Sequence, residues 1–163
     1  MYIVVGLGNP GDEYALTRHN TGRMAANFLA GKVSGIKIFT PETFMNKSGL
    51  AVAKAMAGKS AKKLIVIYDD LDLGLGTIKI SYNRSSGGHK GLESIIRALK
   101  TKEFTRIRIG IGKGKRVEVE KYILGQFRKP ELEILKKVFK RVSEAVRTIV
   151  EYDLTRAMTE YNA

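Results

Sequence analysis

The sequence predicts an α/β fold in which a mixed, mainly parallel sheet lies between two layers of helices, a three-layer sandwich. Short apolar runs that end in glycine or aspartate have the length and composition of buried strands. They alternate with segments whose apolar residues recur every three or four positions, as on one face of a helix. Strands that alternate with helices form layered sandwiches, and 163 residues suffice for one such unit. We therefore expect a single domain over residues 1–163.

The first half of the chain contains the clearest strand and two short helices. Residues 2–5 form an uninterrupted apolar run that ends at a glycine, which predicts a buried strand. Apolar residues at helical spacing predict a helix over 21–30, and the run 36–39 predicts a strand that ends before a proline. Ser48 is a candidate N-cap for a second helix over 49–57.

The second half continues the alternation. Residues 64–68 are uniformly apolar or aromatic and predict a second buried strand. Polar and apolar residues alternate over 77–82 and 106–112, which predicts two further strands, with a helix over 93–100 between them. The last predicted element is a long helix over 130–153, because its apolar residues form one stripe and a proline occupies its first turn.

The charge balance of the chain indicates its partner. There are 29 Lys plus Arg against 16 Asp plus Glu, giving a net charge of +13 and a pI near 10.0. Such an excess attracts polyanions and makes binding salt-dependent. Nucleic acid is therefore the expected partner, and a merely solubilising surface is the alternative.

Composition also excludes several classes of site. The chain has no cysteine, which excludes disulfides, thiol nucleophiles and thiolate zinc sites. With only two histidines we expect no histidine-rich metal centre, although a carboxylate site for magnesium stays open. No apolar run reaches the length of a membrane span and no signal-peptide pattern is present. We therefore expect a cytoplasmic protein without a membrane partner.

A glycine-rich turn, Gly-Leu-Gly-Asn-Pro-Gly at 6–11, follows the first predicted strand. Its spacing matches the dinucleotide-binding motif G-x-G-x-x-G. That motif opens directly into a helix and is followed by an acidic residue near the end of the next strand. Here the loop continues, and no Asp or Glu occurs between positions 13 and 42, so a nicotinamide enzyme is disfavoured. The loop instead presents Tyr14 and the run Thr-Arg-His-Asn at 17–20.

Five motifs, in order along the chain, closely resemble those of bacterial-type peptidyl-tRNA hydrolases. The matching segments are GLGNPG at 6–11 with Tyr14 and TRHN at 17–20, PETFMNKSG at 41–49, YDDLD at 68–72, GGHKGL at 87–92 and RIRIGIG at 106–112. The resemblance implies a compact α/β enzyme that hydrolyses the ester joining a peptide to the terminal ribose of tRNA. It also implies that neither metal nor cofactor takes part.

The resemblance further implies the catalytic residues. His19 is the counterpart of the general base, and imidazole suits that role because its reference pKa of about 6.5 is close to working pH. Asp69 corresponds to the aspartate that orients the base. Asn46 resembles the residue that positions water or peptide and stabilises the oxyanion. Asn9 resembles the residue that separates peptidyl-tRNA from aminoacyl-tRNA, because a free α-ammonium group has no acceptor for its amide. No serine lies in a nucleophile-elbow pattern, so we expect direct attack by water.

Other matched positions concern the substrate. Tyr14 and Phe44 match residues that contact the tRNA end, where aromatic rings stack on a base or ribose, and Met45 lines the same groove or belongs to the core. Phosphate contacts suit an enzyme that accepts many tRNAs. The candidate cations, each of which is otherwise an ordinary exposed charge, are Lys79, Arg84, Arg106, Arg108, Lys113, Lys115 and Arg116. We expect His89 to shape a loop or touch RNA, and the protein to be a monomer.

The chain departs from the family in two places. Lys90 stands where an asparagine is usual, and lysine can donate hydrogen bonds but not accept them. We expect Lys90 to contact the substrate, through a phosphate or the oxyanion. Fewer residues than usual separate His19 from Asn46, which predicts a missing strand or hairpin at a sheet edge. These departures keep a non-catalytic RNA-binding relative open as an alternative. A third hypothesis is an esterase for another acylated compound, which the excess basic charge disfavours.

Overall fold

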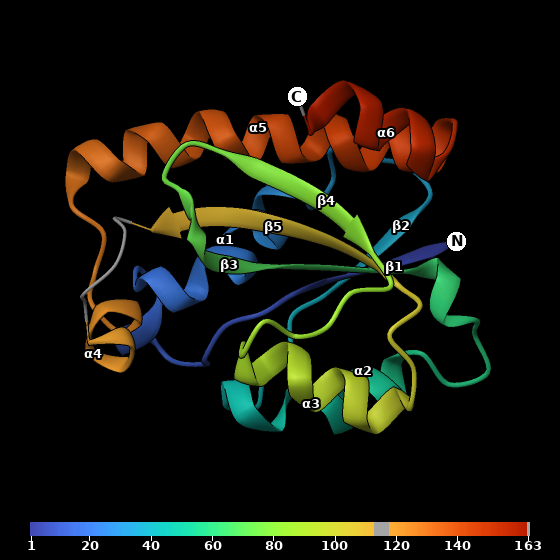
Figure 1. Ribbon diagram of the computed structural model, residues 1–163, viewed down its shortest axis with the longest axis horizontal. Coiled ribbons are helices and arrows are strands. Elements are labelled where there is room, and N and C mark those ends of the chain that lie inside the picture. Colours follow the sequence, from blue (N-terminus) through green and yellow to red (C-terminus); the bar gives the residue numbers. More distant parts are fainter. Residues whose placement is uncertain (113–117, 163) are drawn as a thin grey trace.

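One five-stranded sheet forms the centre of the protein (Figure 1). The computed structural model describes residues 1–112 and 118–162, and within them the strand order is β2-β1-β3-β5-β4. The strands are β1 (Tyr2–Gly6), β2 (Ile36–Phe39), β3 (Leu64–Gly74), β4 (Ile78–Tyr82) and β5 (Thr105–Gly112). All neighbours pair in parallel except β4, which is antiparallel to β5. The predicted mixed, mainly parallel sheet is confirmed.

Helices cover both faces of this sheet (Figure 1). They are α1 (Thr21–Leu29), α2 (Ser48–Ala55), α3 (Lys90–Leu99), α4 (Val119–Ile123), α5 (Lys129–Glu151) and α6 (Leu154–Tyr161). Successive residues of β3 face opposite sides. Ile65 and Ile67 pack in the core beneath α1, α5 and α6, whereas Leu64 and Val66 pack against α2 and α3. The strand pattern therefore fills two cores, as a three-layer sandwich requires.

Some element boundaries differ from those predicted. β3 continues through the acidic cluster to Gly74, because these residues still pair with β5, Asp69 with Ile109 and Asp70 with Gly110. Ser48 lies inside the first turn of α2 and donates to the carbonyl of Met45 instead of capping the helix. The short helices α4 and α6 were not predicted.

Two glycines bring α2, α3 and the preceding turn close together. A Cβ atom at Gly49 would collide with the backbone of Ser94 on α3, whose hydroxyl accepts a hydrogen bond from the Gly49 N–H at 2.8 Å. A Cβ atom at Gly91 would lie 2.5 Å from the Met45 sulfur. These contacts hold the segment around Met45 against the start of α3, at the edge of the sheet where the functional residues gather.

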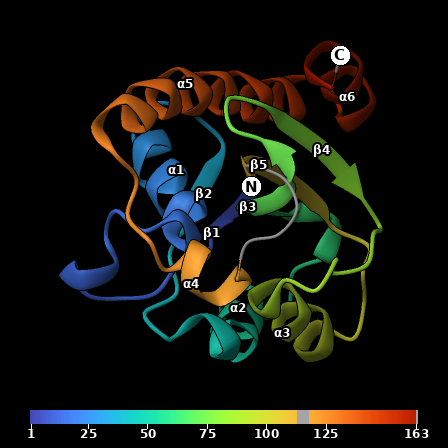
Figure 2. The same cartoon turned by 60° about the vertical axis from the view of Figure 1, so that its left-hand side comes forward.

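The helix α4 lies near the carboxyl ends of the parallel strands (Figure 2). It contacts the 3-10 turn Arg18–Asn20, and its Glu120 lies near Lys90 at the start of α3. None of the helices in the described part of the chain is long and apolar enough to cross a membrane.

Candidate functional site

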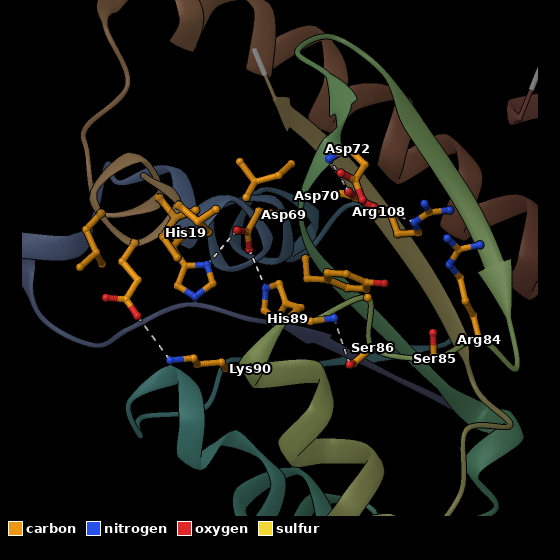
Figure 3. A pocket seen from close by; sticks show the side chains of 18 residues that line it. His19, Asp69, Asp70, Asp72, Arg84, Ser85, Ser86, His89, Lys90 and Arg108 are labelled. Atoms are coloured by element: carbon orange, nitrogen blue, oxygen red, sulfur yellow. Dashed lines mark hydrogen bonds and ion pairs between the residues drawn. The ribbon is translucent and has the colours of Figure 1, made fainter. Parts of the chain in front are cut away.

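Three elements bring titratable side chains together at the carboxyl ends of the strands, where ligands bind in α/β sheets (Figure 3). His19 lies in the 3-10 turn that precedes α1, and flanking threonines fix that turn. The Thr17 hydroxyl donates to the carbonyl of Tyr14, and the Thr21 hydroxyl donates to the carbonyl of Arg18. The turn thus projects the imidazole of His19 toward β3.

A single carboxylate joins the chain's two histidines. His19 Nδ1 lies 2.7 Å from Asp69 Oδ2, and His89 Nε2 lies 2.9 Å from Asp69 Oδ1. The two imidazole centroids are 4.9 Å apart. His89 reaches this place because Gly87 and Gly88, with φ of 61° and 86°, fold the preceding loop back before α3. The predicted pair of His19 and Asp69 therefore has a third partner, His89, for which the sequence predicted only that it shapes a loop or touches RNA.

The charge state of Asp69 follows from this environment. Burial alone raises the pKa of its carboxyl group, but the imidazoles of His89 and His19 outweigh burial and hold the pKa well below its usual range. Asp69 is therefore a carboxylate throughout the neutral range and accepts hydrogen bonds on both oxygens. Such a group orients an imidazole and stabilises its protonated form.

The same three side chains are the candidates for a metal centre. One ligand atom each from His19, Asp69 and His89 lies within 4.8 Å of the others. Both carboxylate oxygens already accept hydrogen bonds from these rings, so a cation would have to replace both interactions. The magnesium alternative at the acidic cluster does not fit its geometry, because Asp70 binds the Arg108 guanidinium at 2.9 Å and the backbone N–H of Asp72.

Asn9 is buried and connects two loops of the candidate site. Its backbone exchanges hydrogen bonds with the side chain of Asn20, at 2.8 and 2.9 Å. Its side-chain Oδ1 accepts a hydrogen bond from the backbone N–H of Met45 at 2.8 Å. The glycine-rich turn is therefore tied to the segment that contains Asn46.

The other predicted substrate residues lie beside this connection. Asn46 is exposed in the 3-10 turn Met45–Lys47. The rings of Tyr14 and Phe44 meet edge to face with centroids 6.1 Å apart, and Phe44 is 54% exposed. Met45 is buried and packs in the core, so the groove alternative for this residue is wrong.

A pocket of about 590 Å³ opens next to the His19–Asp69–His89 cluster (Figure 3). Its walls are the end of β3, the loop 84–89 and apolar side chains of α4. The lining includes His19, Asp69 and Lys90 of the predicted residues, but not Asn9, Asn46, Tyr14 or Phe44.

The predicted cations differ in their availability. Lys79 is exposed on β4, Arg84 is exposed in the pocket wall, and the Lys90 ammonium lies 3.7 Å from Glu120 at the surface. Arg108 also lines the pocket but is largely buried in its pair with Asp70.

Arg106 does not fit the expectation of a phosphate contact. Its side chain is fully buried and donates to the carbonyls of Lys102, Phe104 and Arg84. Burial also lowers the pKa of this guanidinium to about 10. Its role is to tie the start of β5 to the pocket loop. Lys113, Lys115 and Arg116 lie outside the described residues.

Sequence reasoning also missed the contribution of Arg18. Its guanidinium stacks on the ring of Tyr122 at 4.3 Å, donates to the Tyr122 carbonyl and lies 3.6 Å from Glu131. Its backbone N–H donates to the carbonyl of Gly125. The residue before His19 therefore holds α4, one wall of the pocket. The only feature of the sequence that could have indicated this contribution is the position of Arg18 beside His19, a candidate catalytic residue.

Comparisons with known proteins show which sequences the chain resembles. A family model described as peptidyl-tRNA hydrolase matches residues 3–163. The peptidyl-tRNA hydrolase of Thermodesulfovibrio yellowstonii is 44% identical over 188 aligned positions, which cover 99% of each chain. That of Thermotoga maritima is 41% identical over 180 positions, covering 99% of this chain and 97% of the relative. Both alignments are longer than the 163 residues of this chain, which agrees with a shortened form.

A solved structure extends the comparison to the fold. The crystal structure of peptidyl-tRNA hydrolase from Acinetobacter baumannii superposes with a TM-score of 0.89 and 29% sequence identity. The match covers 100% of this chain and 95% of that one.

Proposed function

The chain belongs to the peptidyl-tRNA hydrolase family, and we propose that it hydrolyses the ester between a peptide and tRNA with His19 as the base that activates water. Water adds to the ester carbonyl, and the bond to the ribose oxygen breaks. The products are a peptide with a free carboxylate and a tRNA with a free terminal hydroxyl group. The observation that carries this proposal is the His19–Asp69 hydrogen bond at the edge of the pocket.

The proposed base step uses the two nitrogens of His19 differently. Its Nδ1 faces the Asp69 carboxylate, which can only accept a hydrogen bond, so Nδ1 carries the proton. Nε2 then has a free lone pair to take a proton from water as that water attacks. The imidazolium that forms is stabilised by Asp69 and returns its proton to the departing ribose oxygen.

The two asparagines are proposed to recognise the peptide. Asn9 Oδ1 is engaged by Met45, so its Nδ2 is the group available to donate to a peptide carbonyl. A free α-ammonium group offers no such acceptor, which would disfavour aminoacyl-tRNA. The exposed amide of Asn46, on the adjoining turn, would donate to the developing oxyanion.

We further propose that tRNA binds through its backbone and its end. The exposed cations Lys79, Arg84 and Lys90 are the candidates for phosphate contacts among the described residues. Tyr14 and Phe44 present aromatic faces to the tRNA end. Within this proposal the protein acts as a cytoplasmic monomer, one domain over 1–163.

The test is release of the acyl group from N-acetyl-aminoacyl-tRNA, with free aminoacyl-tRNA as the comparison substrate. We expect cleavage of the blocked substrate only, and a loss of about a thousandfold in kcat for His19→Ala, within the range of a general base. The control is Lys137→Ala, an exposed residue on α5 away from the pocket lining, which should retain activity. Tight tRNA binding without turnover would support the RNA-binding alternative. Equal cleavage of both substrates would remove the role proposed for Asn9.

A further inference from the structure

Both ring nitrogens of His89 have partners, and Figure 3 shows the one on Asp69. Nε2 lies 2.9 Å from Asp69 Oδ1, and Nδ1 lies 3.2 Å from the backbone nitrogen of Leu92. The second contact is the N-cap of α3, because His89 immediately precedes the helix. The side chain is only 8% exposed, and Tyr68 packs edge-on against its ring with centroids 4.9 Å apart. The ring is therefore held in one orientation.

These partners determine where the proton of His89 resides. A backbone N–H can only donate, so Nδ1 must offer its lone pair to Leu92. The neutral ring then carries its single proton on Nε2, which points at the Asp69 carboxylate.

We propose that His89 is a positioning residue for the hydrolysis: as the neutral Nε2–H tautomer it fixes Asp69 and shares its negative charge, leaving His19 ready to accept a proton from water. The inference rests on the proposed function of His19. A carboxylate with two N–H donors attracts each proton less strongly than a carboxylate with one. Without the donor from His89, Asp69 would hold the protonated form of His19 more tightly.

Among the described residues, Asp69 is the charged group that contacts His89 directly. From β3 come Asp69 and the phenol of Tyr68, and burial raises the pKa of that phenol to about 12, so it is neutral. From the turn before α1 comes the imidazole of His19. On α3 itself, the next side chain, Lys90, extends to Glu120 instead.

Two substitutions separate the two hydrogen bonds of His89. In His89→Asn the amide oxygen still caps α3, because asparagine is a preferred N-cap, but the shorter side chain cannot also reach Asp69. In His89→Gln the longer amide can donate to Asp69. We expect His89→Asn to lower kcat by roughly ten- to a hundredfold, as for loss of one hydrogen bond to a charged group. We also expect the acid limb of the pH profile to move to higher pH, because Asp69 then holds the protonated form of His19 more tightly. We expect His89→Gln to recover most of the rate and the wild-type acid limb.

Affinity for deacylated tRNA and thermal unfolding are measured on the same variants. A wild-type pH profile in His89→Asn, or a change confined to tRNA affinity, would overturn the inference and make His89 an RNA contact or a helix cap. If His89→Asn does not fold, His89→Gln alone tests the inference. A shifted acid limb in His89→Gln, with its helix content unchanged, would also overturn the inference. Failure of the proposed function looks different, because either the wild type would then not cleave the blocked substrate or His19→Ala would keep the wild-type rate.

Discussion

At the scale of single residues, Asp69 connects the chemistry to the stability of the fold. Its carboxylate is buried and accepts hydrogen bonds from His19 and His89. Its folded-state pKa lies below the ordinary value of 3.8, because the two imidazoles outweigh the effect of burial. A depressed pKa means that the charged form stabilises the fold above the unfolded-state pKa. That contribution disappears as the pH falls through the folded-state pKa.

Asp69→Asn should therefore destabilise the protein in a pH-dependent way. We expect the variant to unfold with a free energy about 2 kcal/mol lower than the wild type near pH 7, from the lost charged hydrogen bonds. The difference should narrow as the pH falls below about 4, because Asp69 then takes up a proton in the unfolded state of the wild type while it stays charged in the folded state, and this favours unfolding. Urea unfolding of both proteins at several pH values measures this difference in the free energy of unfolding. A difference that stays constant down to strongly acidic pH would contradict the depressed pKa.

The residues of this site show where sequence reasoning succeeds. The motifs identified His19 and Asp69 from segments 50 positions apart, and the structure brings them to 2.7 Å. The orientation of His89 was not predictable, because it depends on two glycines with positive φ that turn the loop back. Arg106 was misassigned for a related reason. Alternation along a strand shows which residues share a face, but not whether that face is covered.

At the scale of elements, the contacts of Arg18 link the 3-10 turn that contains His19 to α4. The guanidinium contacts the ring and carbonyl of Tyr122, while the following residues Ile123 and Leu124 line the pocket. Gly125 completes this junction, since a Cβ atom there would lie 2.6 Å from an Arg18 nitrogen. One arginine therefore holds a pocket wall next to the proposed base.

Arg18→Lys keeps the charge but loses the planar face that stacks on Tyr122. We expect KM for the blocked substrate to rise about five- to tenfold, because the wall formed by α4 loosens. We expect kcat to change less, because the bond between His19 and Asp69 does not involve Arg18. The matched control is Arg128→Lys, whose side chain is 72% exposed although it also pairs with Glu131. A fall in kcat at unchanged KM would contradict this role.

The elements differ in how far sequence could predict them. The long stripe of α5 and the buried runs of β1 and β3 carry enough apolar residues to be recognised. The five residues of α4 are too few to show a helical period, and α4 is held by the contacts of Arg18. The sequence does contain a signal for α6, because aspartate is a preferred N-cap and Asp153 caps this helix by accepting a hydrogen bond from the Arg156 N–H.

At the scale of the whole molecule, the sheet determines where the excess charge can act. The parallel strands place the His19–Asp69–His89 cluster at one edge, and the pocket wall there carries the exposed cations Arg84 and Lys90. Other cations, such as Lys137 on α5, belong to the helical layer on the far face of the sheet from α3. A net charge of +13 raises the local concentration of tRNA generally. Only cations that touch phosphates should change the number of counterions released on binding.

Salt dependence of tRNA binding distinguishes these two kinds of charge. For a protein that neutralises phosphates, the logarithm of the binding constant falls linearly with the logarithm of the salt concentration, by about one unit of slope per contact. We expect Lys90→Gln to weaken binding of deacylated tRNA and to reduce the slope by about one, because Lys90 lines the pocket and only a loose surface pair with Glu120 competes for it. Lys137→Gln removes the same charge and should leave the slope unchanged. Equal changes in both variants would mean that Lys90 acts through the overall charge, and an unchanged slope in Lys90→Gln would remove it from the tRNA interface.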